Sequence, residues 1–458
     1  MAFMRRIVRW FFTLIVLGAI GLGIAYYFAG TLEGPAITIN LPPVIGQANT
    51  LDVTVEAPAA DVSALTIQLE QKGRTLPLLD LAAPPATGLV RSGDVLRVTR
   101  PIGKQSLPEL QSGPATLRVT ASRPVLRKLR YVTSEATRDL QVRLEPPRVA
   151  VVSTHHFVNV GGSEMVVYRA APPDVDSGVR VGDMFYPGFP GSGAGLTDPA
   201  LKVAFFAVLH DQKPDAPMMV SATDPAGNGA RAQFEHRVFP KAFRASRIPL
   251  DDTFLSRVVP SILETSPQIG AASDDLLPAF LKINNELRRA NNETIAAQAK
   301  KTAPKILWEG AFEALGGSQV ESSFADFRTY VYKGKEVDRQ VHLGFDLAKT
   351  ANAPVTAANH GKVVFAGDLG IYGNCVIVDH GMGVQSLYGH LASLGVQDGQ
   401  DVRKGQTLGA SGQTGLAGGD HLHFSMMLNG RFVNATEWWD PHWIEDRVTR
   451  KLREAGRP

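Results

Sequence analysis

The sequence of 458 residues predicts a mainly β protein that begins with one membrane-spanning helix. Three observations support this fold class. The stretch Trp10 to Leu32 has no charged side chain and is mostly apolar. Much of the remaining chain consists of short alternating runs separated by turns rich in Gly and Pro, of which the chain has 44 and 30. Helical texture is concentrated at residues 246–304, and a chain of this length predicts two to four domains.

The composition narrows the possible functions. The 47 Lys and Arg residues nearly balance the 44 Asp and Glu residues, which leaves a net charge of +3 and no basic domain for nucleic acid. Cys375 is the only cysteine, so an intramolecular disulfide and a cysteine-based zinc cluster are excluded. It lies in the apolar run Cys375–Val378, which favours a small buried core residue over a reactive thiol.

The apolar run at residues 10–32 is long enough, as a helix, to cross about 30 Å of hydrocarbon. Three arginines precede it, whereas the first charge after it is Glu33, so residues 1–9 are expected in the cytoplasm. The alternative is a cleaved signal peptide, but Tyr27 to Ala29 fits the small-residue cleavage pattern poorly. We therefore expect a single-pass protein of the cytoplasmic membrane, with the bulk of the chain on the periplasmic or cell-wall side.

The next two hundred residues predict one or two immunoglobulin-like β-sandwich modules. Alternating runs such as Leu51–Val55 and Leu65–Leu69 indicate short antiparallel strands. The doublet Pro146-Pro147 marks a boundary, after which a second β-rich module is expected at residues 147–245.

The helical segment at residues 246–304 has its own signals. Ser273, Asp274 and Asp275 are suited to cap the amino terminus of a helix. Apolar side chains then fall near one face, namely Leu277, Phe280, Leu281 and Leu287. We interpret this segment as an amphipathic packing helix. The alternative is an element that docks on, or blocks, a groove of the domain that follows it.

Two histidines near the carboxyl end, His421 and His423, lie one residue apart in a predicted strand and therefore face the same way. Converging neutral imidazoles are what a catalytic metal site with a proton-transfer group requires. Upstream, His342 and Asp346 would be about 13 Å apart in a fully extended chain. The chain has to bend for both to reach one metal, and Gly344 permits a bend.

Five motifs in the last third of the chain resemble, in type and order, the zinc endopeptidases of the lysostaphin and LytM type, the M23 metallopeptidases. They are His342–Asp346, Asp379–Gly381, Leu387–Leu391, Val402–Gln406 and His421–Phe424. The resemblance covers about residues 320–445. It implies a compact antiparallel β domain with the metal in a groove on one sheet.

The resemblance also implies roles for individual residues. His342, Asp346 and His423 correspond to the ligands of one zinc ion, and His390 and His421 correspond to the two catalytic histidines. Two imidazoles and one carboxylate leave a tetrahedral zinc one position for water. The two catalytic histidines would orient that water, move its proton and stabilise the oxyanion.

Other residues of this region receive structural interpretations. One departure from the family pattern lies at Ser322 to Arg328, where Ala325 replaces a glycine and one residue is added, which alters a groove wall. Tyr330 or Tyr332 is a candidate to line the groove. The remaining histidines are assigned to turns, packing or solvated positions, namely His155, His156, His360, His380 and His442.

The expected function is that of a membrane-anchored zinc metalloendopeptidase that hydrolyses peptide cross-links of bacterial cell-wall peptidoglycan. The β modules offer a surface for an envelope protein partner. One alternative is a non-catalytic regulator that activates another cell-wall hydrolase. A further alternative is an adhesive ectodomain with a vestigial final domain.

We expect seven segments along the chain, the last of which is a basic tail that we interpret as a solvated helix end. They are a cytoplasmic amino terminus at 1–9, a transmembrane helix at 10–32, β modules at 33–146 and 147–245, a helical segment at 246–304, an M23-type zinc peptidase domain at 305–445 and a basic tail at 446–458.

Overall fold

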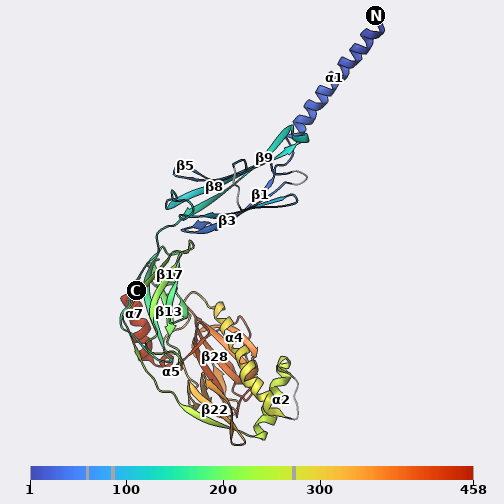
Figure 1. The fold of residues 1–458 in the computed structure, drawn as a ribbon. Helices are drawn as coiled ribbons and strands as arrows, with labels where there is room; N and C mark the ends of the chain where they lie inside the picture. Colours follow the sequence, from blue (N-terminus) through green and yellow to red (C-terminus); the bar gives the residue numbers. More distant parts are fainter. Residues whose placement is uncertain (1, 58–60, 84–87, 271–274, 457–458) are drawn as a thin grey trace. The chain divides into compact units, whose positions relative to one another are not determined.

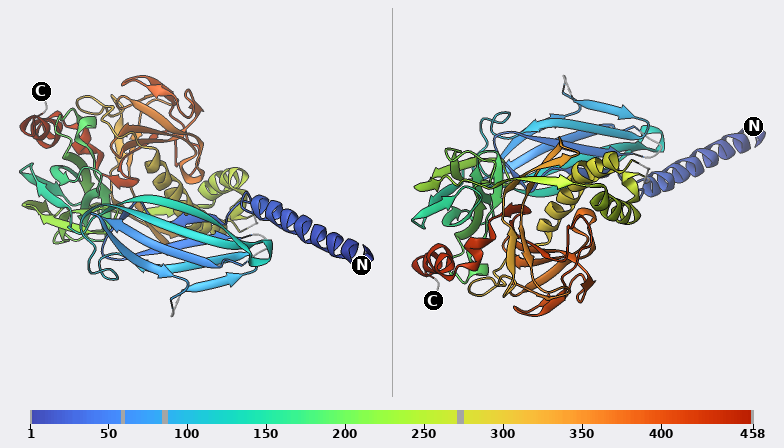
Figure 2. Two further views of the ribbon diagram at one scale, coloured as in Figure 1. Left: turned by 90° about the horizontal axis from the view of Figure 1, so that it is seen from above. Right: turned by 90° about the horizontal axis from the view of Figure 1, so that it is seen from below.

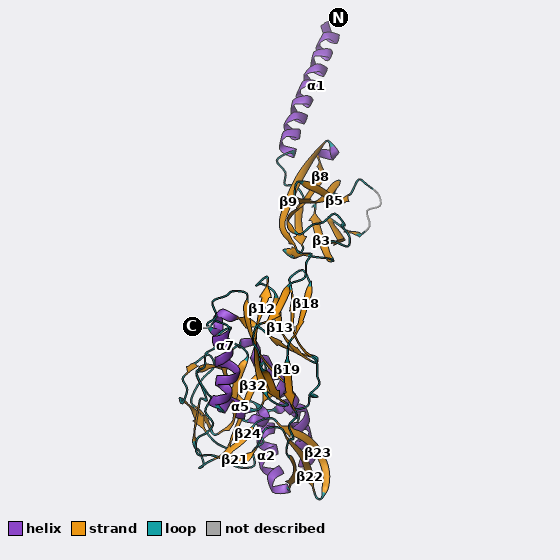
Figure 3. Cartoon of the chain, turned by 90° about the vertical axis from the view of Figure 1, so that its left-hand side faces the viewer, coloured by secondary structure: helices purple, strands orange, loops and turns teal. Residues whose placement is uncertain are grey.

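The computed structural model describes residues 2–57, 61–83, 88–270 and 275–456. The chain is mainly β, with 44% strand and 22% helix, which confirms the predicted fold class at this level. It divides into two compact units, Met1–Pro146 with Thr223–Gly229, and Pro147–Ala222 with Ala230–Pro458. Figure 3 shows that strands dominate both units.

Helix α1 (Ala2–Ala29) opens the chain (Figure 1). Its 28 residues span about 42 Å at 1.5 Å per residue. The part from Phe3 to Ala29 is apolar enough to cross a membrane, and a signal sequence would have the same properties. The helix begins and ends earlier than the predicted span at 10–32, and membrane anchoring stays a prediction.

The first unit contains two sheets that share one hydrophobic core. Val53, Leu65 and Leu117 are fully buried in that core because alternate side chains of their strands face inward. The immunoglobulin-like character of the module stays a prediction. One sheet has the order β1 (Ala36–Asn40), β3 (Asn49–Glu56), β7 (Val95–Ile102) and β6 (Leu89–Ser92). The other has the order β2 (Val44–Ile45), β9 (Arg130–Val142), β8 (Gly113–Val125), β4 (Ala64–Gln71) and β5 (Arg74–Asp80).

The second unit begins with three small sheets that occupy most of residues 148–239. The first sheet has the order β10 (Arg148–Val151), β12 (Ser163–Ala171), β16 (Leu201–Ala207) and β15 (Phe189–Pro190). The second has the order β14 (Met184–Pro187), β13 (Asp176–Val181), β17 (Met218–Thr223) and β18 (Gly229–Gln233). The third is the parallel pair β11 (His156–Asn159) and β19 (His236–Phe239). His155 is exposed, whereas His156 is buried against Ser153 and the Glu235 carbonyl. The two side chains therefore do not share a ligand.

The carboxyl-terminal part is built on an eight-stranded sheet. Its order is β21 (Gln319–Ser322), β24 (Phe345–Ala348), β32 (Leu422–Leu428), β28 (Val384–Leu391), β27 (Asn374–Gly381), β26 (Gly361–Asp368) and β30 (Asp401–Val402), with β33 (Arg431–Val433) paired to β32. Cys375 lies in β27 as a fully buried free thiol, which confirms its predicted core position.

Two further sheets flank the large one. The first has the order β20 (Ala245–Leu250), β22 (Asp326–Tyr332) and β23 (Lys335–His342), and β20 runs parallel to β22. The second has the order β25 (Pro354–Thr356), β31 (Thr407–Ala410) and β29 (Ser393–Leu394).

The helical segment packs on the carboxyl-terminal sheet, and both views of Figure 2 show the two side by side. It consists of α2 (Asp252–Thr265), α3 (Leu276–Lys282), a π-helical turn (Ile283–Leu287) and α4 (Arg288–Gln298). Asp275 caps α3, while Ser273 and Asp274 lie outside the described residues. Asn291 of α4 accepts a hydrogen bond from the Ile371 amide at 3.0 Å. Phe280 and Leu287 are buried, as expected of a packing helix.

The carboxyl-terminal helices pack against the second β module. They are α5 (Ala435–Trp439), α6 (Pro441–Ile444), a π-helical turn (Glu445–Thr449) and α7 (Arg450–Glu454). Lys451 is 1% exposed and donates to Glu164 Oε1 at 2.7 Å, so the expectation of a solvated basic tail is wrong at this position. Arg450 and Arg453 form ion pairs with Asp446 and Glu445, and Arg457 lies outside the described residues.

One hydrophobic core runs from the second β module into the carboxyl-terminal sheet. The ring centroid of Phe205 on β16 lies 6.4 Å from that of Trp308 and 5.9 Å from that of Trp438. Residues on both sides of the expected boundaries at 245 and 304 therefore share their core. His442, in the aromatic run that supplies Trp438, is exposed on α6.

The buried carboxylate of Glu437 links α5 to this module. It accepts hydrogen bonds from Asn159 Nδ2 at 3.0 Å and from the Ser163 amide at 2.7 Å. Burial raises the pKa of Glu437 to about 7, although the hydrogen bond from Asn159 acts in the opposite direction. Ionised Glu437 is therefore costly inside the fold at neutral pH.

We expect the change in melting temperature caused by Glu437→Gln to be more favourable at pH 8 than at pH 4. The pKa of Glu437 in the folded protein, about 7, lies above its usual value of 4.5. Protonated Glu437 therefore contributes fully to stability below pH 4.5, and this contribution is lost as the pH rises through 7. Ionisation costs about 3 kcal/mol, which a neutral amide avoids at high pH. The NH2 group of the amide faces one of the two N–H donors and loses that hydrogen bond at every pH. Scanning calorimetry with chelator present tests this, with Glu264→Gln, at an exposed glutamate of α2, as the control. An equal shift at both pH values would contradict it.

Candidate active site

Three side chains from different strands meet in one buried cluster. His342 ends β23, Asp346 lies on β24, and His423 lies on β32, where it is the register partner of Asp346. The distances are 2.9 Å from His342 Nε2 to Asp346 Oδ1, 3.0 Å from His342 Nε2 to His423 Nδ1, and 3.0 Å from His423 Nδ1 to Asp346 Oδ1. This spacing is close to that of donor atoms that share one ion at about 2.0–2.2 Å.

The chain does bend between His342 and Asp346, because β23 and β24 belong to different sheets. Gly344 serves this bend for a different reason from the expected one, since its backbone is not in the left-handed region. A Cβ atom at Gly344 would lie 2.5 Å from the His423 ring and 2.6 Å from Ser425 Oγ. The glycine is required by this close approach.

Hydrogen bonds on the far sides of both imidazoles fix their tautomers. His342 Nδ1 lies 3.3 Å from the Ser323 carbonyl, which only accepts, and 3.2 Å from Ser322 Oγ. Ser322 Oγ donates its hydrogen to Asp326 Oδ2 at 3.5 Å and so accepts from Nδ1, which leaves the hydrogen on Nδ1 and a lone pair on Nε2. Ser425 Oγ donates to the Leu343 carbonyl at 2.9 Å and therefore accepts from His423 Nε2 at 3.0 Å. His423 Nδ1 then presents a lone pair as well. Two lone pairs 3.0 Å apart beside a carboxylate fit a bound cation.

Arg328 holds the carboxylate of this cluster and was not predicted as a site residue. Its Nη2 donates to Asp346 Oδ2 at 3.0 Å and to Ser322 Oγ at 2.8 Å. Burial raises the pKa of Asp346, but its contacts with His342, and then those with His421 and His423, hold that pKa well below its usual range. The signal for Arg328 was its position at the end of the Ser322 to Arg328 motif.

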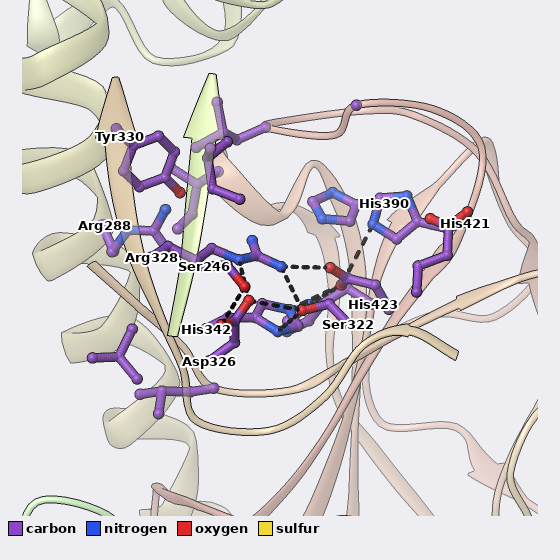
Figure 4. A pocket seen from close by; sticks show the side chains of 18 of the residues that line it. Ser246, Arg288, Ser322, Asp326, Arg328, Tyr330, His342, His390, His421 and His423 are labelled. Atoms are coloured by element: carbon purple, nitrogen blue, oxygen red, sulfur yellow. Dashed lines mark hydrogen bonds and ion pairs between the residues drawn. The ribbon is translucent and has the colours of Figure 1, made fainter. Parts of the chain in front are cut away.

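His390 and His421 lie beside the cluster and complete the predicted set (Figure 4). Their ring centroids are 4.9 Å apart, and that of His390 is 5.7 Å from that of His423. His390 Nδ1 donates to the Thr414 carbonyl at 2.8 Å, and His421 Nδ1 donates to the Gly419 carbonyl at 2.9 Å. Each ring is thereby fixed with its Nε2 as the remaining nitrogen, and that of His421 lies 3.5 Å from Asp346 Oδ1.

The environments of these two histidines shift their pKa values in opposite directions. Burial, followed by the charges of His421 and His423, holds the pKa of His390 well below its usual value. Burial lowers the pKa of His421 too, but the hydrogen bond and the charge of Asp346 outweigh burial and raise it. Pairs whose pKa values are driven apart are suited to separate acid and base roles.

Two residues at the site have a strained backbone that the sequence did not reveal. His390 has φ 62° and Ala325 has φ 61°, in the left-handed region that favours glycine. Ala325 is the residue that replaces a glycine of the family pattern, and its amide donates to the His342 carbonyl at 2.7 Å. The replacement therefore leaves the local path in place at a conformational cost of about 1–3 kcal/mol.

The cluster opens into a cavity of about 580 Å³. Tyr330 lines this cavity as expected, whereas the Tyr332 hydroxyl donates to Asp252 at 2.6 Å. His380 is buried in β27 and bonded to the His360 carbonyl and Ser386, so it lies outside the cluster.

The helical segment borders this cavity. Phe254 of α2 and Arg288 of α4 line it. Arg257 Nη2 donates to the carbonyl of Gly418 at 2.8 Å, and Gly418 belongs to the glycine-rich loop that leads to His421. The alternative expectation, that this segment lies at a groove, agrees with these contacts.

The carboxyl-terminal part matches known proteins. Residues 340–435 match the family described as Peptidase family M23. The DD-carboxypeptidase/endopeptidase Mpg of Neisseria meningitidis serogroup B is 40% identical over 95 residues, which are 21% of this chain and 22% of the relative. The peptidoglycan DD-endopeptidase ShyA of Vibrio cholerae is 39% identical over 94 residues, 20% of this chain and 22% of the relative. These matches thus span about a fifth of the relatives' length.

Among solved structures, the catalytic domain of lysostaphin from Staphylococcus simulans is 26% identical and covers 29% of this chain and 98% of that chain, with a TM-score of 0.25. The family match and the curated relatives identify the domain that contains the cluster. Residues 340–435 of this chain form a domain of peptidase family M23.

Proposed function

We propose that the chain is a zinc-dependent endopeptidase in which His342, Asp346 and His423 hold one zinc ion. The observation that carries the proposal is the pair of imidazole lone pairs, fixed by outer hydrogen bonds, that face each other and Asp346 in a buried cavity. Two imidazoles and a carboxylate are a ligand set typical of catalytic rather than structural zinc. When bound, zinc supplies Lewis acidity and acidifies water in its open position.

The two neighbouring histidines supply proton transfer in this proposal. His390 is neutral because its pKa is lowered, so its Nε2 accepts a proton from the attacking water. His421 has a raised pKa and a ring fixed by Gly419, so its Nε2 donates a hydrogen bond to the developing oxyanion. Arg328 keeps Asp346 ionised and oriented throughout.

The proposed substrate is the peptide part of peptidoglycan. Support comes from the family match and from relatives named as peptidoglycan or DD-endopeptidases over this domain. We further propose that α1 anchors the chain in the cytoplasmic membrane and leaves the remainder outside, where such a substrate occurs. The lack of charge across residues 10–32 and the preceding arginines support this orientation.

Removal of the metal or of one ligand should abolish hydrolysis. We expect the full chain with zinc to release soluble muropeptides from peptidoglycan, and we expect at least a 100-fold loss with chelator or in His423→Ala, because the ligand set is then incomplete. His442→Ala, at an exposed histidine on α6, is the matched control and should keep full activity. Chromatography of the released fragments measures the rates. Equal release by all samples would refute the enzymatic proposal.

The hydrogen bond between His423 Nε2 and Ser425 Oγ should strengthen zinc binding. Ser425→Ala removes the hydroxyl that accepts from His423 Nε2 and frees that ring to change tautomer. We expect zinc to bind roughly 10–100-fold more weakly, as is usual for such partners of ligating histidines. Competition with a fluorescent chelator measures the dissociation constant, and Ser393→Ala at an exposed serine of β29 is the control. An unchanged constant in Ser425→Ala would contradict the assigned tautomer.

A further inference from the structure

The cavity has a basic wall formed by residues that precede the matched domain. Arg244 directly precedes β20, Arg247 lies in β20, and Arg288 is the first residue of α4. Arg328 differs from these three because Asp326 and Asp346 neutralise it. Among the described residues that line the cavity, Glu321 is the only carboxylate outside an ion pair with an arginine or lysine. The wall therefore carries an excess of positive charge.

The excess continues along α4 into a second cavity of about 610 Å³. Arg288 and Asn292 line both cavities, so they stand where the two meet. The second cavity adds the cationic side chains of Arg289, Lys300 and Arg431, against Glu293 as its one acidic residue in the described chain. A ligand that extends from the cluster of His342, Asp346 and His423 along α4 would thus pass Arg288.

The guanidinium of Arg288 is held in place by neutral groups. Its Nε donates to the Asn284 carbonyl at 3.1 Å and its Nη2 donates to Asn284 Oδ1 at 2.6 Å. Asn284 is itself fully buried, and its Nδ2 donates to Asp338 Oδ2 at 2.7 Å, which fixes the orientation of the amide. A guanidinium has five N–H donors, so at least two remain for a ligand. The charge is thus oriented in advance and unpaired.

Arg288 is also linked to the candidate metal ligands through Tyr372 and Asn292. Tyr372 packs its ring on His423, with the centroids 5.4 Å apart, and its hydroxyl donates to Asn292 Oδ1 at 3.3 Å. Asn292 follows Arg288 by one turn of α4, so both project on the same side of the helix. Figure 4 shows Arg288 at the end of the cavity next to Tyr330, with the histidines across from it.

We propose that Arg288 binds a carboxylate of the peptide substrate and thereby selects acidic peptides over neutral ones. This inference rests on the proposed peptidase function and assigns the substrate class of that site. A pre-oriented guanidinium matches the planar geometry of a carboxylate and forms two parallel hydrogen bonds with it. Arg244 and Arg247 also line the cavity and form no ion pair within the part of the chain that the structure describes, so they add attraction for the same charge.

The test compares a cross-linked muropeptide with the same peptide after conversion of its carboxyls to carboxamides. Binding is measured by calorimetry on the full, zinc-loaded chain that carries His421→Ala, so that cleavage does not interfere. We expect the acidic peptide to bind at least tenfold more tightly than the amide. Arg288→Gln should remove about tenfold or more of the affinity for the acidic peptide and leave the amide within a factor of about three. Arg288→Lys should restore part of the preference because it keeps the charge.

Arg289→Gln is the matched control, because it removes the same charge from the next position of α4, which lines the second cavity alone. It should leave the ratio between the two peptides unchanged. Equal weakening of both peptides by Arg288→Gln, or the same loss in Arg289→Gln, would overturn the inference.

Hydrolysis by the chain with His421 intact distinguishes this failure from that of the proposed function. Cleavage of both peptides at the same kcat/KM would refute the carboxylate site and retain the peptidase. An Arg288-dependent preference in binding without cleavage would do the reverse.

Discussion

The candidate site is built around two imidazole nitrogens that face each other at 3.0 Å beside a carboxylate. Both nitrogens present lone pairs, because Ser323 and Ser425 engage the opposite nitrogen of each ring. Without a cation, this arrangement would place like partial charges together in a buried space, which is costly. The strand pairing that sets Asp346 opposite His423 therefore supports the proposed metal site.

The grouping of the five candidate side chains could be predicted from the sequence because their signals are local. Strand alternation places His421 and His423 on one side, and motif order links them to His342, Asp346 and His390. Local signals also misled in one respect. Gly344 suggested a special backbone angle, whereas the structure shows that a ring from a distant strand occupies the space of its side chain.

The remaining features depend on contacts between distant segments, which a single sequence does not display. Lys451 looks like one more basic residue of a terminal helix, yet it forms a buried ion pair with a glutamate 287 positions earlier. The motif that ends at Arg328 does not show that this side chain binds the Asp346 carboxylate, and the helical texture of residues 246–304 does not show which of its side chains line the cavity. The left-handed backbone of His390, within a strand, was equally invisible, and such strain is common at catalytic positions.

One core joins the second β module to the sheet that carries the candidate ligands, which limits how the carboxyl-terminal part can be isolated. Trp308 and Trp438 rest on Phe205, and Lys451 needs Glu164, so a shortened chain that starts near residue 305 would expose an aromatic surface and leave a buried ammonium without its counter-charge. The loss of a partner from such a pair typically costs about 3–5 kcal/mol. Low activity in that fragment would thus reflect a damaged scaffold and would say nothing about whether the removed helices restrain the proposed activity.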